Sequence, residues 1–273
     1  MTVRLALAQH RATPDLAANL ERMLRTMGEA KERGADVFCV PELALMPFFP
    51  QHERHEAAPY AEPVPGPTTD RVAARARALG LVTIFNLYEE ARGRFYDSSP
   101  VFDADGSLLG VTRMVHITDY ACFHERAYYD GGDRGAPVYD TAAGRIGVAI
   151  CYDRHFPEYM RALGVGDAEL VVIPQAGALD EWPEGMYEAE VRTAAFQNGY
   201  FTALCNRVGA EDRLTFAGES FVTDPRGEVL VRGRRLDEDL VMVDVDFSDC
   251  ARSPARTLFW RDRRPELYAD WID

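Results

Sequence analysis

Hydrophobic residues along this chain recur in two different periods, and the change between them predicts an alternation of strands and helices. Residues 3–9 and 35–40 are short apolar runs typical of strands. Between them, after Thr13-Pro14-Asp15, one face of a predicted helix carries Leu16, Leu20, Met23, Leu24 and Met27. The chain therefore begins with a strand, a helix that ends at Gly34, and a second strand.

The same pattern continues, but pairs of strands interrupt it. Residues 95–101 and 108–115 suit two strands joined by a turn at residues 103–106. Further strands are expected at 81–87, 169–174, 200–205, 219–223, 229–232 and 240–245, and helices at 70–79, 156–163 and 182–198. Adjacent strand pairs exclude a simple doubly wound sheet, so we expect an α/β fold in which two sheets face each other and helices cover the outer faces.

No linker or low-complexity tract divides the 273 residues. We therefore expect one domain, 1–273. Its tail, residues 250–273, is too polar for a core of its own, and we expect it to pack across the body or on a partner subunit.

Composition narrows the class of function. A net charge of -14 argues against a nucleic-acid partner, and no apolar run is long enough to cross a membrane. The N-terminus lacks the pattern of a signal peptide. The five cysteines form no CxxC pair, which argues against disulfides, a metal site and a redox pair. We expect a cytoplasmic protein. Lys31 is its only lysine.

Residues 146–158, IGVAICYDRHFPE, combine a buried strand, a polar turn and a helix start. Such a turn would place Cys151 near free backbone N–H groups and a helix N-terminus, both of which favour a thiolate. A buried, inert core cysteine fits the stretch equally well. Glu42 also follows a buried strand, where a solvated loop residue is the alternative. Residues 116–135 form a long polar loop, typical of a functional segment.

Several separate blocks resemble the nitrilase superfamily of carbon–nitrogen hydrolases, in that family's order. They are VPELALMPF (40–48), GVTRMVHITD (110–119), FHERAYYDGGD (123–133), GRIGVAICYDRHFPE (144–158), NGYFTALCNRVG (198–209), LTFAGESFVTDPRGEVL (214–230) and RDRRPELY (261–268). The chain is most similar to the N-carbamoylputrescine amidase, β-ureidopropionase and carbamoyl amino-acid hydrolase branches. The resemblance implies a four-layer α-β-β-α sandwich, no cofactor, and a homodimer or larger homo-oligomer.

The resemblance also assigns roles to residues. Glu42 matches the general base, Cys151 the nucleophile, and Glu125 the second glutamate that positions the substrate. Met114 stands where the family has its catalytic lysine, and Lys31 cannot replace it because it lies on the first predicted helix. The neighbouring Arg113 should point to the opposite face of its strand. His116 shares the face of Met114, either as a partial substitute or as a structural histidine.

These roles predict a reaction. Cys151 would attack a small amide or N-carbamoyl substrate, the backbone N–H of Tyr152 would bind the oxyanion, and ammonia would leave from a thioester intermediate. Arg154 and His155 would bind a substrate carboxylate, although Arg154 could instead pair with Asp153 or Glu158. His124 would line the pocket.

Loss of the lysine predicts weakened activity. Losing one oxyanion donor costs about 10²–10³ in rate. The alternative is a family member that keeps its pocket as a binding or scaffold protein without turnover.

Overall fold

Two mixed sheets face each other in the computed structural model, which describes residues 2–53, 56–268 and 270. The first sheet has the order β15 (Asp239–Asp246), β1 (Thr2–Gln9), β2 (Val37–Cys39), β3 (Val82–Ile84), β5 (Arg94–Phe102) and β4 (Leu87–Ala91), with β6 (Leu108–Arg113) also paired to β5. The second has the order β14 (Val229–Arg232), β13 (Phe221–Thr223), β10 (Phe201–Asn206), β9 (Leu170–Gln175), β8 (Gly144–Val148) and β7 (Val138–Thr141). A small ribbon joins β11 (Val208–Ala210) to β12 (Thr215–Ala217).

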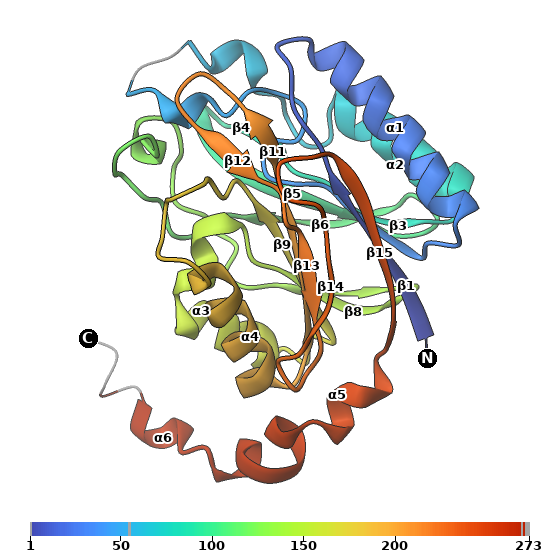
Figure 1. Cartoon of the computed structure of the whole chain (residues 1–273), viewed down its shortest axis with the longest axis vertical. Coiled ribbons are helices and arrows are strands. Elements are labelled where there is room, and N and C mark those ends of the chain that lie inside the picture. Colours follow the sequence, from blue (N-terminus) through green and yellow to red (C-terminus); the bar gives the residue numbers. More distant parts are fainter. Residues whose placement is uncertain (1, 54–55, 269, 271–273) are drawn as a thin grey trace.

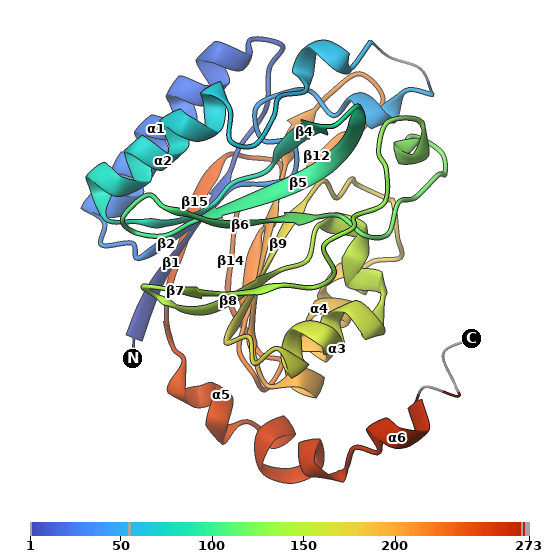
Figure 2. The ribbon, with the colours of Figure 1, turned by 180° about the vertical axis from the view of Figure 1, so that it is seen from behind.

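Helices cover the outer face of each sheet, which completes the predicted α-β-β-α sandwich (Figures 1 and 2). On the first sheet lie α1 (Leu16–Glu32) and α2 (Pro67–Leu79), and on the second lie α3 (Pro157–Val165) and α4 (Met186–Asn198). Short turns and helices complete the described chain: η1 (Phe49–Gln51), η2 (Ala58–Tyr60), η3 (Glu125–Ala127), η4 (Cys151–His155), α5 (Ser248–Arg252), η5 (Ala255–Phe259), η6 (Trp260–Asp262) and α6 (Pro265–Tyr268).

The predicted face of α1 forms the contact with the first sheet. Asp15 caps the helix by accepting a hydrogen bond from the backbone N–H of Ala18 at 2.9 Å. Leu20, Met23 and Met27 are buried against the sheet. Each such side chain contributes about 1.5–3 kcal/mol when it leaves water. The amphipathic pattern therefore places and stabilises this helix.

Three elements differ from the sequence-based expectation. The single strand expected at 81–87 is two strands, β3 and β4, because the chain leaves the partner β2 near Asn86 and turns into a hairpin with β5. α4 begins at Met186 rather than near Trp182, since Pro183 and the left-handed Gly185 (φ 81°) break the first turn. The ribbon of β11 and β12 was not expected.

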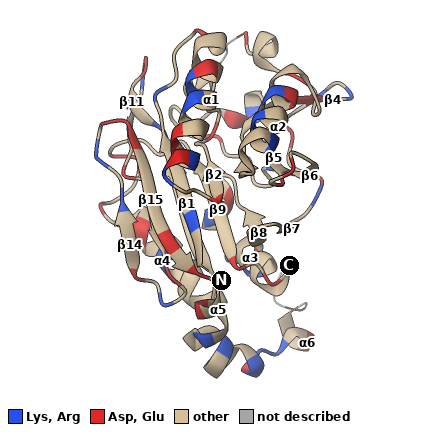
Figure 3. Ribbon diagram, turned by 90° about the vertical axis from the view of Figure 1, so that its right-hand side faces the viewer, with Lys and Arg blue, Asp and Glu red and all other residues tan. Residues whose placement is uncertain are grey.

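Acidic and basic residues are interspersed over α1 and α2 (Figure 3). Among the described residues, no helix has both the length and the apolar character needed to cross a membrane. The tail first packs on α3 and α4: Arg256 donates to the backbone oxygen of Gly164, and the rings of Phe196 and Phe259 lie 5.7 Å apart. Its last residues, 269 and 271–273, are outside the described part.

Candidate active site

Glu42, Glu125 and Cys151 meet in the interior, between the two sheets. One donor atom from each side chain lies within 4.8 Å of the others, and all three residues are buried. Glu42 follows β2 of the first sheet, Glu125 opens η3 in the long loop, and Cys151 opens η4 after β8 of the second sheet. The spacing is compatible with a small metal ion, and equally with a nucleophile and the two carboxyls that serve it.

A strained turn presents Cys151. Its φ is 41°, in the left-handed region that non-glycine residues rarely adopt. Its backbone oxygen accepts a hydrogen bond from Nη1 of Arg154 at 2.8 Å. Buried Asp153 accepts from the backbone N–H groups of Val115 and His116 at 3.1 and 3.0 Å. Tyr152 is the second residue of η4, in the first turn of a helix, where backbone N–H groups lack intrahelical acceptors.

The expectation that this turn favours a thiolate is wrong. Burial raises the pKa of the Cys151 thiol well above its usual range, and the Glu42 carboxylate raises it further. Arg154 lowers it but does not cancel the effect of burial. A one-turn 3₁₀ helix offers too little dipole to overcome complete desolvation. Cys151 is therefore a thiol at neutral pH, and it needs a base to take its proton.

Glu42 is the nearest base, and its own ionisation is held back. Burial, followed by the charge of Glu125, raises its pKa to about 8. Arg207, Asp97 and the Cys151 thiol lower it by smaller amounts. Neither carboxylate oxygen of Glu42 has a hydrogen-bond partner among the described residues. A pKa near neutrality suits a group that accepts and returns one proton in each cycle.

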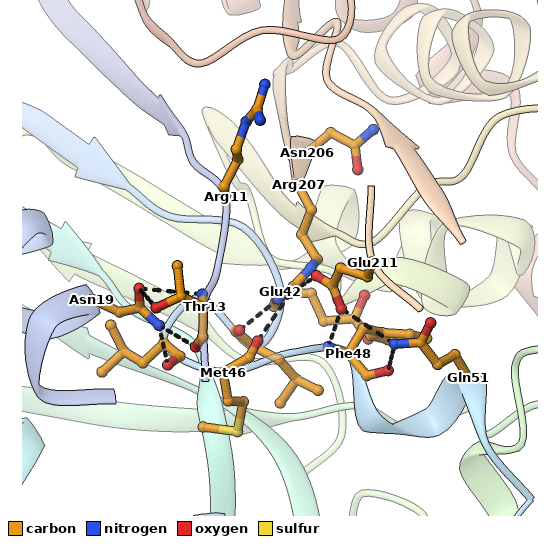
Figure 4. Close-up of polar contacts among 12 residues, drawn as sticks. Arg11, Thr13, Asn19, Glu42, Met46, Phe48, Gln51, Asn206, Arg207 and Glu211 are labelled. Atoms are coloured by element: carbon orange, nitrogen blue, oxygen red, sulfur yellow. Dashed lines mark hydrogen bonds and ion pairs between the residues drawn. The ribbon is translucent and has the colours of Figure 1, made fainter. Parts of the chain in front are cut away.

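Arg207 fixes the backbone at Glu42, and sequence reasoning assigned it no role (Figure 4). Its guanidinium donates to the backbone oxygens of Glu42 at 2.9 Å, Leu43 at 2.6 Å and Met46 at 2.9 Å. Glu211 pairs with the same group, and the Arg207 side chain is 2% exposed. An arginine after β10 therefore clamps the loop that carries the base. The only sequence signal was its place in the block NGYFTALCNRVG.

Only one of the two carboxyl oxygens of Glu125 accepts a hydrogen bond from the described residues. Its Oε2 accepts a hydrogen bond from the backbone N–H of Thr118 at 3.3 Å, while Oε1 has no partner in the described structure. Burial, and then the charge of Asp97, raises its pKa well above the usual range. Burial therefore favours the protonated form of the Glu125 carboxyl.

Met114 lies at the end of β6 and is 1% exposed. Its backbone N–H donates to the oxygen of Asp97 at 2.9 Å. Arg113 points to the other face, as expected, where it binds Glu89 through Nε and Nη2 at 2.8 and 2.6 Å. Lys31 is bonded to the backbone oxygens of Ala35 and Gly80, at the end of α1. No lysine serves the site.

His116 stabilises the turn that carries the nucleophile. Its Nδ1 lies 2.7 Å from Oδ1 of Asp153, and its ring stacks on Phe156 with 3.6 Å between centroids. The structural interpretation of this histidine is therefore favoured over a substitute for lysine.

Arg154 is less available than its sequence position indicates. Nη1 is bonded to Cys151 and to Oε1 of Gln175, and the guanidinium lies over the ring of Tyr187 at 4.6 Å. Its Nε and Nη2 have no hydrogen-bond partner among the described residues, but Oε2 of Glu190 lies 3.4 Å from Nε. The pairing with Asp153 or Glu158 is not what the structure contains. The edge of the guanidinium formed by Nε and Nη2 therefore faces Glu190 as an ion pair without a hydrogen bond.

The two histidines expected to bind or line the substrate pocket are each paired with a carboxylate. His155 pairs through Nδ1 with Oε1 of Glu190 at 2.7 Å, and His124 pairs with Asp119 at 3.1 Å. Glu181, which sequence reasoning did not single out, accepts hydrogen bonds from Tyr120 at 2.5 Å, from Trp182 at 3.1 Å and from Tyr187. The rings of Tyr120 and Tyr152 lie 6.5 Å apart, and Tyr187 lies under the guanidinium of Arg154, so this group lies beside the turn that carries the nucleophile.

Known proteins share both sequence and architecture with this chain. An N-carbamoylputrescine amidase of Solanum lycopersicum is 31% identical over 280 residues, which cover 97% of this chain and 93% of that protein. A carbon–nitrogen hydrolase from Helicobacter pylori G27 superposes with a TM-score of 0.90 at 26% identity, over 100% of this chain and 99% of that one.

A variant amidase from Nesterenkonia sp. AN1 superposes with a TM-score of 0.81 at 26% identity, covering 99% and 97% of the two chains. In it, the acetamide moiety of fluoroacetamide is covalently added at the active-site cysteine. Residues 4–255 of the present chain match the family described as Carbon-nitrogen hydrolase. With a buried cysteine and two carboxyls converging between its sheets, the chain belongs to the carbon–nitrogen hydrolase family.

Proposed function

We propose that this protein hydrolyses the C–N bond of a small amide or N-carbamoyl compound and releases ammonia, with Cys151 as the nucleophile. The observation that supports it is the convergence of Cys151, Glu42 and Glu125 within 4.8 Å. The relatives named as amidases support the same class of substrate.

The first half of the reaction forms a thioester. Glu42 takes the thiol proton as the sulfur of Cys151 bonds to the carbonyl carbon, and the backbone N–H of Tyr152 donates to the oxyanion. Glu125 holds the substrate amide through its carboxyl. Glu42 then passes its proton to the leaving nitrogen, the C–N bond breaks, and ammonia leaves.

The second half consumes water. Glu42 accepts a proton from water as its oxygen attacks the thioester carbon, and the proton returns to the sulfur of Cys151. An amide yields a carboxylic acid. An N-carbamoyl compound yields a carbamic acid, which loses carbon dioxide and leaves an amine. Glu42 therefore carries a single proton back and forth, for which a pKa of about 8 is suitable.

The test is ammonia release from a panel of simple amides and N-carbamoyl amino acids, with Cys151→Ala as the blank. Ammonia from the parent but not from the variant supports the proposal. A trapped adduct on Cys151, seen by mass spectrometry of the denatured protein, would identify the thioester. Equal release from parent and blank would refute a cysteine mechanism.

Met114 favours a second candidate, a binding or scaffold protein that keeps the pocket without turnover. Methionine offers neither a hydrogen bond nor a charge to an oxyanion. This candidate predicts that amides bind equally well to the parent and to Cys151→Ala, and that the parent forms no product. Ammonia release at an appreciable rate by the parent would exclude it.

For the substrate we propose an N-carbamoyl acid whose carboxylate binds this edge of Arg154, with His155 and His124 beside it. Nε and Nη2 of Arg154 lie on one edge, which is the geometry for a bidentate carboxylate. The Arg154 side chain is 1% exposed, so the carboxylate must displace Glu190.

We further propose a homodimer or larger homo-oligomer that buries apolar residues of α3, α4 and the tail. Val165, Phe196 and Leu258 are 52%, 39% and 59% exposed. Light scattering coupled to size-exclusion chromatography measures the mass directly. A monomer of 30.6 kDa at micromolar concentration would contradict this proposal.

A further inference from the structure

Asp97 is a third buried carboxyl at the site, and neither the resemblance nor the proposed reaction gives it a role. It lies on β5, where Ser98 pairs with Arg113 of β6. Ser98 and Arg113 both bond to Glu89 on one face of the sheet. Because side chains alternate along a strand, Asp97 and Met114 lie opposite each other on the other face, toward Glu42.

The hydrogen bonds around Asp97 fix which of its oxygens can carry a proton. The backbone N–H of Leu43 donates to Oδ1 of Asn86 at 2.6 Å, so that atom is an acceptor and Nδ2 of Asn86 is the donor. Nδ2 donates to Oδ1 of Asp97 at 2.7 Å. Oδ1 of Asp97 is therefore occupied as an acceptor, and a proton on this carboxyl resides on Oδ2.

Oδ2 is the oxygen of Asp97 that Asn86 leaves unbonded. Like both oxygens of Glu42, it is buried and has no partner among the described residues. Asn86 holds the two carboxyls near each other, because it bonds both to the backbone of Leu43, next to Glu42, and to Asp97. Two carboxylates in contact in a buried site repel each other strongly, and a proton between them replaces that repulsion with a hydrogen bond.

We propose that Asp97 holds a proton on Oδ2 and donates it to Glu42, so that the two carboxyls share one negative charge in the site that lacks a lysine. Asp97 is thus a positioning residue, which acts on Cys151 through Glu42. The proposal deepens the proposed function and rests on it, because Glu42 is the base of that reaction.

The electrostatics agree with this geometry. Burial, and then the charge of Glu42, raises the pKa of Asp97 well above its usual range. Asp97 in turn lowers the pKa of Glu42, which is the effect expected of a protonated neighbour that donates to it. The charged or titratable groups that face the pair from neighbouring elements are Glu125, Tyr129, Cys151, Asp153 and Arg207. Of these, Arg207 is the only permanent cation, and its guanidinium is bonded to backbone oxygens and Glu211.

The experiment measures how fast iodoacetamide alkylates Cys151 between pH 5 and 10, by peptide mass spectrometry, because this rate follows the base that takes the thiol proton. Asp97→Asn is the decisive variant. Its side-chain oxygen can still accept from Asn86 and its amide can donate to Glu42, but it can never carry a charge. Asp97→Leu removes the donor, and Ser99→Ala is the matched control. Ser99 lies on β5 like Asp97, and its hydroxyl also accepts a hydrogen bond from Asn86, at 3.1 Å.

If Asp97 is a neutral donor, Asp97→Asn keeps the acid limb of the profile within about half a pH unit of the parent. Asp97→Leu moves that limb upward by about one unit, a tenfold lower rate at pH 7. Ser99→Ala leaves it in place. If Asp97 is instead an anion, Asp97→Asn removes a repelling charge and moves the limb downward by about one unit or more. That result, or no shift in Asp97→Leu, overturns the proposal.

Ammonia release by the same variants separates this proposal from the proposed function. Alkylation requires no amide substrate. The expected alkylation profiles without ammonia release would uphold the carboxyl pair and refute the hydrolase. Ammonia release together with a downward shift in Asp97→Asn would uphold the hydrolase and refute the carboxyl pair. Melting curves of each variant identify any that fails to fold, and if Asp97→Leu does not fold, the isosteric Asp97→Asn still decides between a neutral and a charged Asp97.

Discussion

Replacing Met114 with lysine tests how much the missing cation costs. Met114 lies opposite Asp97 across β5 and β6, on the face that holds Glu42, and it is 1% exposed. A lysine there would place its ammonium among Glu42, Asp97 and the Cys151 thiol. It would pair with the single negative charge of the site and offer a donor to the oxyanion, neither of which methionine can do.

The magnitude follows from the ionisation of Glu42. With a pKa of about 8, about one molecule in ten has this base ionised at pH 7. A neighbouring cation lowers a carboxyl pKa by about 1–3 units. Most molecules would then be ionised at pH 7, a gain of up to about tenfold in rate. A restored oxyanion donor adds about 10²–10³.

The assay is ammonia release by Met114→Lys and by the parent across pH 5–10, with Met114→Leu as a control of similar volume. We expect Met114→Lys to be faster and its acid limb to lie at lower pH, with Met114→Leu close to the parent. If Met114→Lys neither gains rate nor shifts its limb, position 114 does not face the base, and the reasoning from strand register fails.

Three further predictions concern groups around the base. The folded protein keeps the proton of Glu42 up to about pH 8, while the unfolded chain releases it near its ordinary value of 4.5, so stability falls as pH rises across that window. Glu42→Gln should therefore abolish turnover yet raise the melting temperature at pH 8 by at least about 2–4 °C. An unchanged melting temperature would contradict the raised pKa of Glu42. Arg207→Lys loses the fork that bonds three backbone oxygens and should cost about 1–3 kcal/mol in urea unfolding, against none for the exposed Arg226→Lys. Glu190→Gln removes the competitor for Arg154 and should lower KM for N-carbamoyl acids but not for neutral amides; equal effects on both would argue against carboxylate binding at Arg154.

Local patterns predicted much of the architecture. The apolar face of α1, the pairing of β5 with β6 and the turn before α3 follow from neighbouring residues, and the structure contains all three. The break between β3 and β4 does not follow from them. It depends on Asn86 bonding to Leu43 and Asp97, which are 43 and 11 residues away.

The residues of the site also divide into those that sequence motifs predict and those that depend on distant contacts. Glu42, Glu125 and Cys151 were found through motifs, and the structure brings them together. The expected thiolate was wrong because a thiol's pKa depends on what surrounds it, and a sequence does not state how deeply a strand end is buried. Asp97 and Arg207 were missed because each acts through a residue distant in the chain, and neither residue type is unusual at its position.

Arg207 also couples the chemistry to the docking of the two sheets. The first sheet supplies Glu42, the second supplies Cys151, and the guanidinium after β10 spans the interface to grip the backbone at residues 42–46. A displacement of one sheet by about 1 Å would separate base from nucleophile while leaving every strand intact, and such misplacement can cost about 10²-fold in rate. The rate of turnover is therefore more sensitive to the relative position of the two sheets than any measure of secondary structure is. Core substitutions far from Cys151 should be detected first as a lower rate of ammonia release.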